Sequence, residues 1–408
     1  MHHDRSGPRR FRNGLAILMV LPVTLAGCAT PKRLPAVPVA QTARAQPVIG
    51  AIRFLAARDP APFADEAIAS IRKEQAYLAS QGKTGPLPPA SYLAISGGGD
   101  NGAFGAGLLN GWTASGTRPE FKVVTGISTG ALSAPFAFLG PDYDDELARV
   151  YTTISPRDVF RMRGLLKGFF ADAMADSTPL MQLVERYVDQ AMLDAIAREY
   201  AKGRLLLVAT ADLDALEPVI WNMTAIAASK DPRAPELFRK ILVASASIPG
   251  AFPPVMIDVT VDGVRHQEMH VDGGTIAQVF LYPPAAKAAL HGHIVARKRT
   301  LYIIRNARLD PDWASVERRT LPVAARAVAS LTQTQGIGDL YRIYVTTQRD
   351  GIDYNLAFIP SSFNVPHRQE FDTDYMRQLF ELGRAEGSAG YRWQKYPPGY
   401  EAAPIDQR

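Results

Sequence analysis

FKVVTGISTGALSAPFAFL, residues 121–139, indicates the architecture of this chain more clearly than any other segment. Its first residues form a mainly apolar, β-branched run that predicts a buried strand, and its last ten predict an apolar helix. Between them lies Gly126-Ile127-Ser128-Thr129-Gly130, with the spacing G-x-S-x-G. A serine on a sharp strand-to-helix turn is open to react, and flanking glycines let strand and helix approach closely. The sequence therefore predicts Ser128 as a nucleophile, with Gly126 and Gly130 forming its turn.

A glycine-rich loop precedes this stretch. It runs from Ser96 to Gly102 (SGGGDNG), after a short apolar strand at 92–96 and before a helical segment. Backbone N–H groups without side chains can point into a cavity and hydrogen-bond the oxyanion of a tetrahedral intermediate, helped by a helix N-terminus. The predicted oxyanion and substrate-binding residues are Gly97, Gly98, Gly99, Gly102 and Thr129.

A third motif, Asp272-Gly273-Gly274, follows a strand predicted at 268–271. A carboxylate followed by two glycines is sterically open to a neighbour, so Asp272 could accept the proton of Ser128. An ordinary aspartate, with a pKa near 4, is a weak base, but burial should raise the pKa.

In this order, the three motifs resemble those of the patatin-like phospholipase family. A further segment, ASASIPGAFPP at 244–254, is similar to one that the family has ahead of its aspartate. The resemblance covers roughly 91–285. It implies Ser128 as nucleophile and Asp272 as base in a Ser–Asp dyad without histidine, and a glycine loop at 97–99. The family often has Arg or Lys where this chain has Asn101.

Strands and helices alternate along the rest of the chain. Further strands are expected at 205–210 and 300–305, and a hairpin at 255–270 around Asp262-Gly263. Helices are expected near 63–81, 103–115, 129–139, 179–200, 235–245, 317–335 and 371–387. This alternation predicts an α/β protein, and the resemblance implies a three-layer α/β/α patatin-like fold with a mostly parallel central sheet.

The N-terminal segment is predicted to be a targeting signal rather than part of the fold. Four arginines within residues 5–12 precede an apolar run at 15–25, the pattern of a signal peptide at 1–27. The run ends in Leu25-Ala26-Gly27-Cys28, which looks like a bacterial lipobox, so the only cysteine is the predicted lipidation site. Ala29 follows it, which in similar lipoproteins favours the outer membrane, facing the periplasm. The predicted partners are therefore a membrane, bound through the anchor, and a membrane lipid as substrate.

Composition limits the remaining organisation. The chain has 408 residues, of which 47% are hydrophobic, so it can bury a large core without disulfides. An Ala/Pro-rich tether is expected at 28–59, one catalytic domain at 60–395 and a tail at 396–408. The net charge of +5 lies largely in the N-terminal segment and gives no reason to expect nucleic-acid binding. No metal or other cofactor is expected, because no Cys/His cluster or H-E-x-x-H occurs.

Three alternatives remain open. Residues 97–102 also fit the G-x-G-x-x-G of a dinucleotide fold, but Glu120, which has the spacing of the ribose ligand, starts a strand rather than ending one. An α/β-hydrolase triad would need a histidine after Asp272, and the candidates are His291, His293 and His367. A non-catalytic lipid- or protein-binding lipoprotein is the third alternative.

Other residues are interpreted as structural. His270 is expected to be a hydrogen-bonded sheet residue, and Asp212 and Asp214 to cap turns. Residues 160–170 (FRMRGLLKGFF) suit either a cap helix or a lipid-surface segment.

Overall fold

A mixed ten-stranded sheet forms the centre of the molecule, which the computed structural model describes at residues 32–55, 58–163, 172–289, 296–311 and 313–400. The strand order is β1-β9-β10-β7-β4-β3-β11-β12, with β8 added beside β7 and β2 beside β8. The strands are β1 (Gln46–Pro47), β2 (Arg53–Phe54), β3 (Ala90–Ile95), β4 (Phe121–Gly126), β7 (Leu205–Asp212), β8 (Glu217–Asn222), β9 (Val255–Val261), β10 (Val264–Asp272), β11 (Arg299–Arg305) and β12 (Asp353–Phe358).

Five neighbouring strands, β7-β4-β3-β11-β12, are parallel, and the remaining pairings are antiparallel. Every residue of β7 is buried, as expected for a strand covered on both faces. Because parallel strands end at the same edge, the loops after β3 and β4 lie together there. The antiparallel β10 pairs with β7 and brings Asp272 opposite Thr210, close to the same edge.

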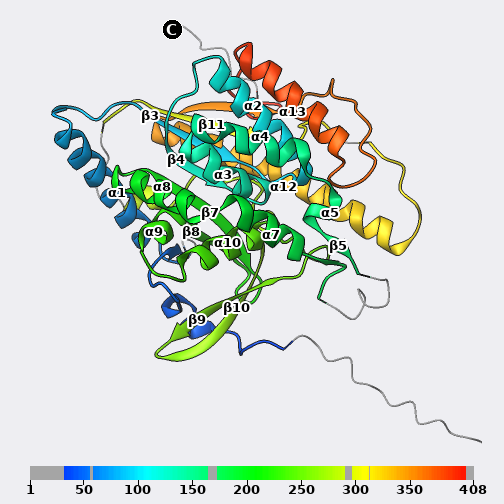
Figure 1. The fold of residues 1–408 in the computed structure, drawn as a ribbon, viewed down its shortest axis with the longest axis horizontal. Helices are drawn as coiled ribbons and strands as arrows, with labels where there is room; N and C mark the ends of the chain where they lie inside the picture. Colours follow the sequence, from blue (N-terminus) through cyan, green and yellow to red (C-terminus); the bar gives the residue numbers. More distant parts are fainter. Residues whose placement is uncertain (1–31, 56–57, 164–171, 290–295, 312, 401–408) are drawn as a thin grey trace, which may run out of the picture.

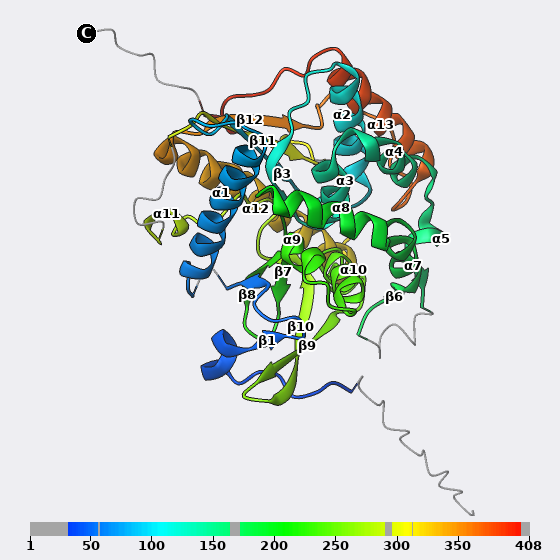
Figure 2. The ribbon, with the colours of Figure 1, turned by 60° about the vertical axis from the view of Figure 1, so that its left-hand side comes forward.

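Helices cover both faces of the sheet (Figures 1 and 2). One face carries α2 (Gly102–Ala114), α3 (Thr129–Leu139), α4 (Asp144–Thr153), α7 (Thr178–Tyr187), α8 (Gln190–Ala201), α9 (Met223–Ala228), α10 (Ala234–Ser245) and α13 (Thr373–Ser388), packed in the larger core. The other face carries α1 (Ala61–Ser80), α11 (Ala286–Ala289) and α12 (Thr320–Asp350). The predicted α/β class is thus confirmed, with a sheet that is parallel at its centre and antiparallel at one side.

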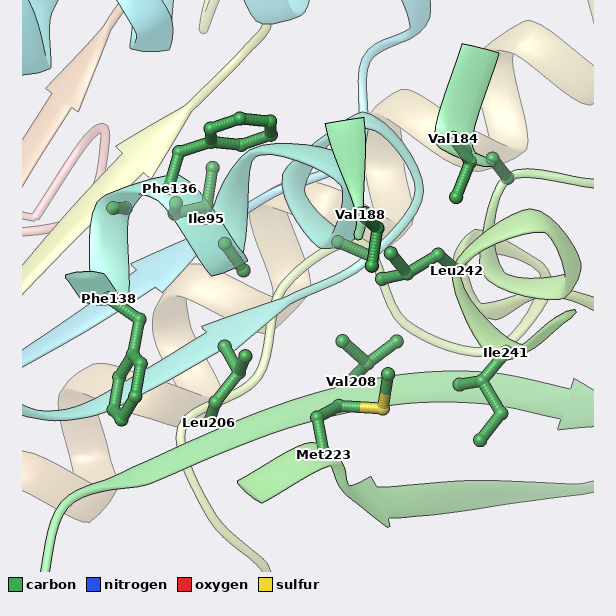
Figure 3. Close-up of a cluster of buried hydrophobic side chains, with 14 of the residues drawn as sticks. Ile95, Phe136, Phe138, Val184, Val188, Leu206, Val208, Met223, Ile241 and Leu242 are labelled. Atoms are coloured by element: carbon green, nitrogen blue, oxygen red, sulfur yellow. The ribbon is translucent and has the colours of Figure 1, made fainter. Parts of the chain in front are cut away.

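The larger core fixes α3 against the sheet. Figure 3 shows Phe136 and Phe138 of α3 among Ile95, Leu206 and Val208, which come from β3 and β7. These side chains are nearly inaccessible to solvent. The apolar residues that follow Ser128 in the sequence therefore hold the start of α3 in place.

Short elements complete the chain. They are the 3₁₀ turns η1 (Val39–Arg44), η2 (Gly99–Asn101), η3 (Pro141–Tyr143) and η4 (Gly273–Thr275), the helix α5 (Pro156–Val159), and a two-stranded sheet of β5 (Arg161–Met162) and β6 (Ala175–Asp176). The helix expected at 179–200 is divided into α7 and α8, because Asp189 caps a new helix by accepting from the N–H of Met192 at 2.8 Å.

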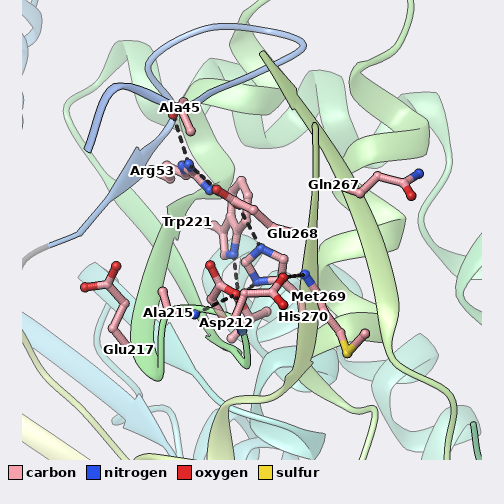
Figure 4. A network of polar contacts seen from close by, with 12 residues as sticks. Ala45, Arg53, Asp212, Ala215, Glu217, Trp221, Gln267, Glu268, Met269 and His270 are labelled. Carbon is pink, nitrogen blue, oxygen red and sulfur yellow. Dashed lines mark hydrogen bonds and ion pairs between the residues drawn. The ribbon is translucent and has the colours of Figure 1, made fainter. Parts of the chain in front are cut away.

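The tether expected at 28–59 is corrected by the structure, since its described part packs on the domain. β1 pairs with β9, β2 pairs with β8, and Ile52 is buried. Arg53 forms a buried ion pair with Glu268 and donates to the carbonyl of Ala45 at 2.9 Å (Figure 4). The Ala/Pro composition concealed strands of only two residues, which are too short for periodicity to reveal.

The predicted tail also begins later than expected. Tyr396 and Tyr400 contact Tyr344 of α12, with ring centroids 6.0 and 4.8 Å away. The signal peptide and Cys28 lie outside the described residues, as do residues 164–170 of the segment, 160–170, that is predicted to be a cap helix or a lipid-surface segment.

Candidate active site

Ser128 lies on the turn between β4 and α3. Its backbone has φ 55° and ψ −126°, a left-handed conformation that side chains rarely adopt. The glycines on either side are required by space: a Cβ on Gly126 would lie 2.4 Å from the carbonyl oxygen of Gly130, and one on Gly130 would lie 2.3 Å from that of Ile95. The sequence prediction of a tight, strained turn is met at each of these positions.

Ser245 holds this turn from α10. Its hydroxyl accepts a hydrogen bond from the N–H of Ser128 at 3.0 Å and donates to the carbonyl of Ala209 in β7 at 2.8 Å. The turn is thereby connected to two neighbouring elements. Sequence reasoning placed Ser245 in a family-like segment but gave it no function.

Asp272 ends β10 next to Ser128. The hydroxyl of Ser128 donates a hydrogen bond to its carboxylate, and the N–H of Gly274 donates to Oδ1 at 2.7 Å. Both side chains are buried, with Ser128 6% and Asp272 5% exposed. Burial raises the pKa of Asp272 to about 7, although the two hydrogen bonds oppose the rise. The structure therefore brings together the two residues that the sequence proposed as a dyad.

The two glycines after Asp272 serve close packing. A Cβ on Gly273 would lie 2.6 Å from the carbonyl oxygen of Ala209, and one on Gly274 would lie 3.0 Å from Oδ1 of Asp272. Only glycine lets this loop pass so near β7 and the carboxylate.

The glycine-rich loop packs against Ser128, and the five predicted oxyanion residues, four in this loop and Thr129 in α3, differ in their contacts. The N–H of Gly97 donates to the carbonyl of Gln278 at 3.0 Å, so this amide is already occupied. The N–H of Gly102 bonds the carbonyls of Asp100 and Gly99, and a Cβ there would lie 2.2 Å from Oγ1 of Thr129. The prediction that Gly97 and Gly102 supply free amide donors is therefore wrong. Their N–H groups are already hydrogen-bonded, and their lack of a side chain lets the loop pack closely on Ser128 and Thr129.

Three predicted amides remain available. Within the described residues, no hydrogen bond uses the N–H groups of Gly98, Gly99 and Thr129. Gly98 has φ 153° and packs so closely on Asn306 that a Cβ would lie 2.2 Å from its carbonyl oxygen. Asn306, just after β11, also donates from Nδ2 to the carbonyl of Ser96 and accepts from the N–H of Gly105. Sequence reasoning missed Asn306.

A clamp from the C-terminal part holds the loop from the other side. The carboxylate of Asp100 bonds Nε2 of His367 at 2.7 Å and accepts from the N–H of Phe371 at 2.8 Å. Next to it, Oδ1 of Asn101 accepts from the hydroxyl of Tyr375 at 2.6 Å. The sequence offered no signal for these contacts, because the partners lie about 270 positions apart and belong to no motif.

An apolar cavity opens at Ser128. Gly99, Ser128 and Thr129 form its polar end, and the rest is mostly aliphatic and aromatic, including Leu132, Ile154, Val159, Leu183, Phe252 and Phe371. Its apolar lining, with a polar end at Ser128, suits a hydrocarbon chain whose first carbon lies near Ser128. Two larger cavities lie elsewhere: one beneath α1, and one behind the Asp272 loop against α12.

Histidines in the described residues bond groups other than the dyad. Nδ1 of His270 pairs with the hydroxyl of Thr210 and Nε2 with Glu268, as expected for a structural sheet residue (Figure 4). His367 bonds Asp100, while His291 and His293 lie outside the described residues. Glu120 is 74% exposed at the start of β4, away from the glycine-rich loop, which removes the ribose ligand that a dinucleotide site would need.

In the described part of the chain, two groups of side chains have the chemistry of metal ligands: Asp212, Glu268 and His270, and Asp100, His367 and Glu370. In the first group, burial alone would raise the pKa of Glu268, but hydrogen bonds from His270 and Arg53 lower it to about 2. Asp212 accepts from the N–H groups of Asp214 and Ala215, the turn cap expected from the sequence. Protein partners therefore occupy most of these ligand atoms.

Residues 93–284 match the model of the patatin-like phospholipase family, a family of serine ester hydrolases. The match contains all three motifs, so the resemblance expected from the sequence is confirmed over this range. A search of curated proteins found no match. The segment after residue 284, with α12, β12, α13 and the clamp on Asp100, lies beyond the match.

Three solved structures are similar at low level. VipD from Legionella pneumophila shares 10% identity, with 74% of this chain and 66% of that chain covered and a TM-score of 0.37. Human GIVD cytosolic phospholipase A2 shares 10% identity, with 67% and 50% covered and a TM-score of 0.28. The type III effector protein ExoU shares 14% identity, with 76% and 56% covered and a TM-score of 0.19. The chain spans less than two thirds of each, and the fold assignment rests on the observed sheet and the family match.

Proposed function

We propose that this chain is a lipid acyl hydrolase that uses Ser128 and Asp272 as a dyad, without histidine or metal. Oγ of Ser128 attacks the ester carbonyl carbon while Asp272 takes the hydroxyl proton. The tetrahedral intermediate collapses, and Asp272 returns the proton to the departing alcohol, which leaves an acyl ester on Ser128. Water, deprotonated by Asp272, then attacks this ester and releases the fatty acid, and the proton returns to Ser128.

The observation that carries the proposal is the hydrogen bond from Ser128 to a buried carboxylate. An aspartate with an ordinary pKa would be too weak a base for a serine hydroxyl. A pKa of about 7 makes Asp272 a stronger base that is still substantially ionised near neutral pH, which is where a general base works best.

The amides of Gly98, Gly99 and Thr129 are the proposed oxyanion donors. They are not consumed by other hydrogen bonds in the described structure, and Gly99 and Thr129 line the cavity at Ser128. Each such donor is typically worth about 3–4 kcal/mol of transition-state stabilisation. The apolar part of the same cavity would hold the acyl chain, which supports a lipid ester as substrate.

Anchoring at Cys28 is the second part of the proposal. Signal-like residues 1–27 end at this cysteine, and lipidation with more than one acyl chain gives stable attachment to a membrane. The protein would then act on the bacterial cell envelope, at the periplasmic face of the outer membrane. Within the described residues, no helix has both the length and the hydrophobicity to cross a bilayer.

Two assays test the dyad: labelling with a fluorophosphonate probe and hydrolysis of a water-soluble ester. Ser128→Ala should abolish both labelling and turnover, and Asp272→Asn should lower both strongly. Ser80→Ala and Asp262→Asn, which change an exposed serine and an exposed carboxylate, are matched controls and should behave as wild type. Folded wild-type protein that neither labels nor turns over ester would favour the non-catalytic alternative. Loss of turnover in His291→Ala or His293→Ala would favour a triad.

A further inference from the structure

The N-terminal half of α12 is an apolar helix without a covering surface in the described structure. Across residues 320–332, only Pro322 and Arg326 are half-buried, and every other residue is exposed. Four large aliphatic side chains face outward: Leu321 is 79% exposed, Val323 51%, Val328 59% and Leu331 70%. Apolar helix faces are normally turned inward, so this segment, here called the projecting helix, indicates an interaction surface.

The shape of this apolar surface favours lipid over a second helix. At 3.6 residues per turn, the four side chains spread over about 160° of the circumference, whereas a coiled-coil seam is a narrower stripe. Alanines at 324, 325, 327 and 329 fill much of the remaining surface. Arg326, the one charged residue in 320–332, lies nearly opposite the centre of this arc, and a broad apolar arc with a basic residue on the other face is typical of segments that lie in a membrane interface.

The C-terminal end of the projecting helix lies where α12 meets the active-site edge of the sheet. Nε2 of Gln335 donates to the carbonyl of Ile276 at 2.6 Å, and Oε1 accepts from Gln278 at 3.1 Å. Gln278 in turn donates to the carbonyl of Gly274, two residues after Asp272. In Figure 1 the yellow first turns of α12 extend to the right, away from the sheet. The apolar surface is therefore continuous with the loop that carries the proposed base.

The segment before the projecting helix adds an aromatic anchor and positive charge. Trp313 is 86% exposed, and tryptophan is enriched where membrane proteins meet the lipid headgroups. Arg318 and Arg319 are exposed, and Glu317 is the only acidic residue between positions 313 and 333. This excess of basic residues complements an anionic lipid surface.

We propose that the projecting helix and Trp313 dock on a bilayer containing anionic phospholipid and present the cavity at Ser128 to it. This inference deepens the proposed function and rests on it for its purpose. The binding itself requires no catalysis, so the two proposals can fail separately. Docking would let an acyl chain pass from the bilayer into the cavity without crossing water.

Tryptophan fluorescence tests the contact directly. The other three tryptophans are buried or half-buried, so Trp313 reports on this surface. Vesicles of phosphatidylglycerol and phosphatidylcholine added to the full chain should shift the emission to the blue, and Trp313→Phe should remove the shift. Pure phosphatidylcholine or high salt should reduce it, because both weaken the attraction of the arginines. Emission that does not move with any vesicle overturns the proposal.

A double variant separates docking from catalysis. Leu321→Gln with Leu331→Gln should weaken vesicle binding roughly tenfold, since it removes two aliphatic anchors. Hydrolysis of vesicle phospholipid should fall in parallel, while hydrolysis of a water-soluble ester stays unchanged. The matched control is Tyr77→Gln with Val345→Gln, which changes exposed apolar residues on α1 and on the packed half of α12 and should bind as wild type.

All variants carry Cys28→Ser, so that no acyl anchor masks the result. Equal vesicle binding by the double variant and its control refutes the docking surface. A wild-type dimer that the double variant converts to monomer, with vesicle binding unchanged, shows that a second copy covers the helix and also refutes it. Vesicle binding without hydrolysis of any ester would refute the proposed function and leave the docking surface supported.

Discussion

Replacing Asp272 by Asn should lower activity strongly and yet stabilise the protein at alkaline pH. Burial raises the pKa of this carboxyl from 3.8 to about 7. The folded state therefore holds the proton more tightly than the unfolded chain. The stabilisation from protonated Asp272 is fully present below pH 4 and is lost as the pH rises through about 7. At 1.36 kcal/mol per unit, ionising the buried group costs about 4 kcal/mol of folding free energy.

The carboxamide of the Asp272→Asn variant cannot ionise, so the variant avoids this cost. Its amide oxygen can still accept from the N–H of Gly274, and its amide nitrogen can donate to the hydroxyl of Ser128. With about 350 ordered residues, the unfolding entropy is roughly 0.7 kcal/mol per degree, so 4 kcal/mol corresponds to about 5 °C. The variant should melt about 5 °C above wild type at pH 8.5 and only about 2 °C above it at pH 5, where about 1.6 kcal/mol of the cost applies.

Thermal melts followed by circular dichroism at the two pH values measure this difference. Asp262→Asn is the control, because Asp262 is exposed at the hairpin turn and paired only with Arg44 at the surface. It should show no pH-dependent shift. A difference between Asp272→Asn and wild type that is the same at pH 5 and pH 8.5 would refute the raised pKa and, with it, the reason that Asp272 can act as a base.

Three further outcomes are expected. For the wild type, kcat/KM on a water-soluble ester should fall tenfold per pH unit below about 7, because Asp272 must be ionised to accept a proton; a profile flat from pH 5 to 8 would contradict this. Asp100→Asn should reduce kcat roughly tenfold with little change in melting temperature, because it weakens the charged hydrogen bond to His367 that holds the glycine loop. Rates of fluorophosphonate labelling check this result, and labelling at the wild-type rate would exclude such a contribution. Cys28→Ser should remove incorporation of radiolabelled palmitate and move the chain to the soluble fraction of cells, and undiminished incorporation would disprove the anchor.

The motifs of the site were predictable because they reflect local backbone geometry. Gly130 is required by its contact with the carbonyl of Ile95 in the neighbouring β3, but Gly126 is required by a contact with Gly130 inside the same strand–turn–helix unit, so the sequence around Ser128 contains that information. The same holds for the strands that alternate with helices. Asp272 was predictable as a strand-end carboxylate, although its distance from Ser128 depends on β10 pairing with β7, which no local pattern specifies.

The supports of the site could not be predicted, because they come from residues distant in the sequence. Asn306, Ser245 and His367 each hold a motif by one to three hydrogen bonds, and isolated polar residues leave no periodic signal. The occupied amide of Gly97 shows the same limit. A glycine in a loop looks equally free in the sequence whether or not a distant carbonyl, here that of Gln278, has taken its N–H.

The docked N-terminal segment has a consequence for orientation. Arg33 bonds Asp214 and the carbonyl of Gln267 on β10, so the chain is fixed to the hairpin side of the domain from this residue on. If Cys28 bears the proposed anchor, the linker from Cys28 to Arg33 is five residues long and, fully extended, reaches at most about 18 Å. A linker this short keeps the hairpin next to the bilayer and restricts the domain to pivoting about that corner. An enzyme held in this way would reach, at any moment, only the lipids close to its own anchor.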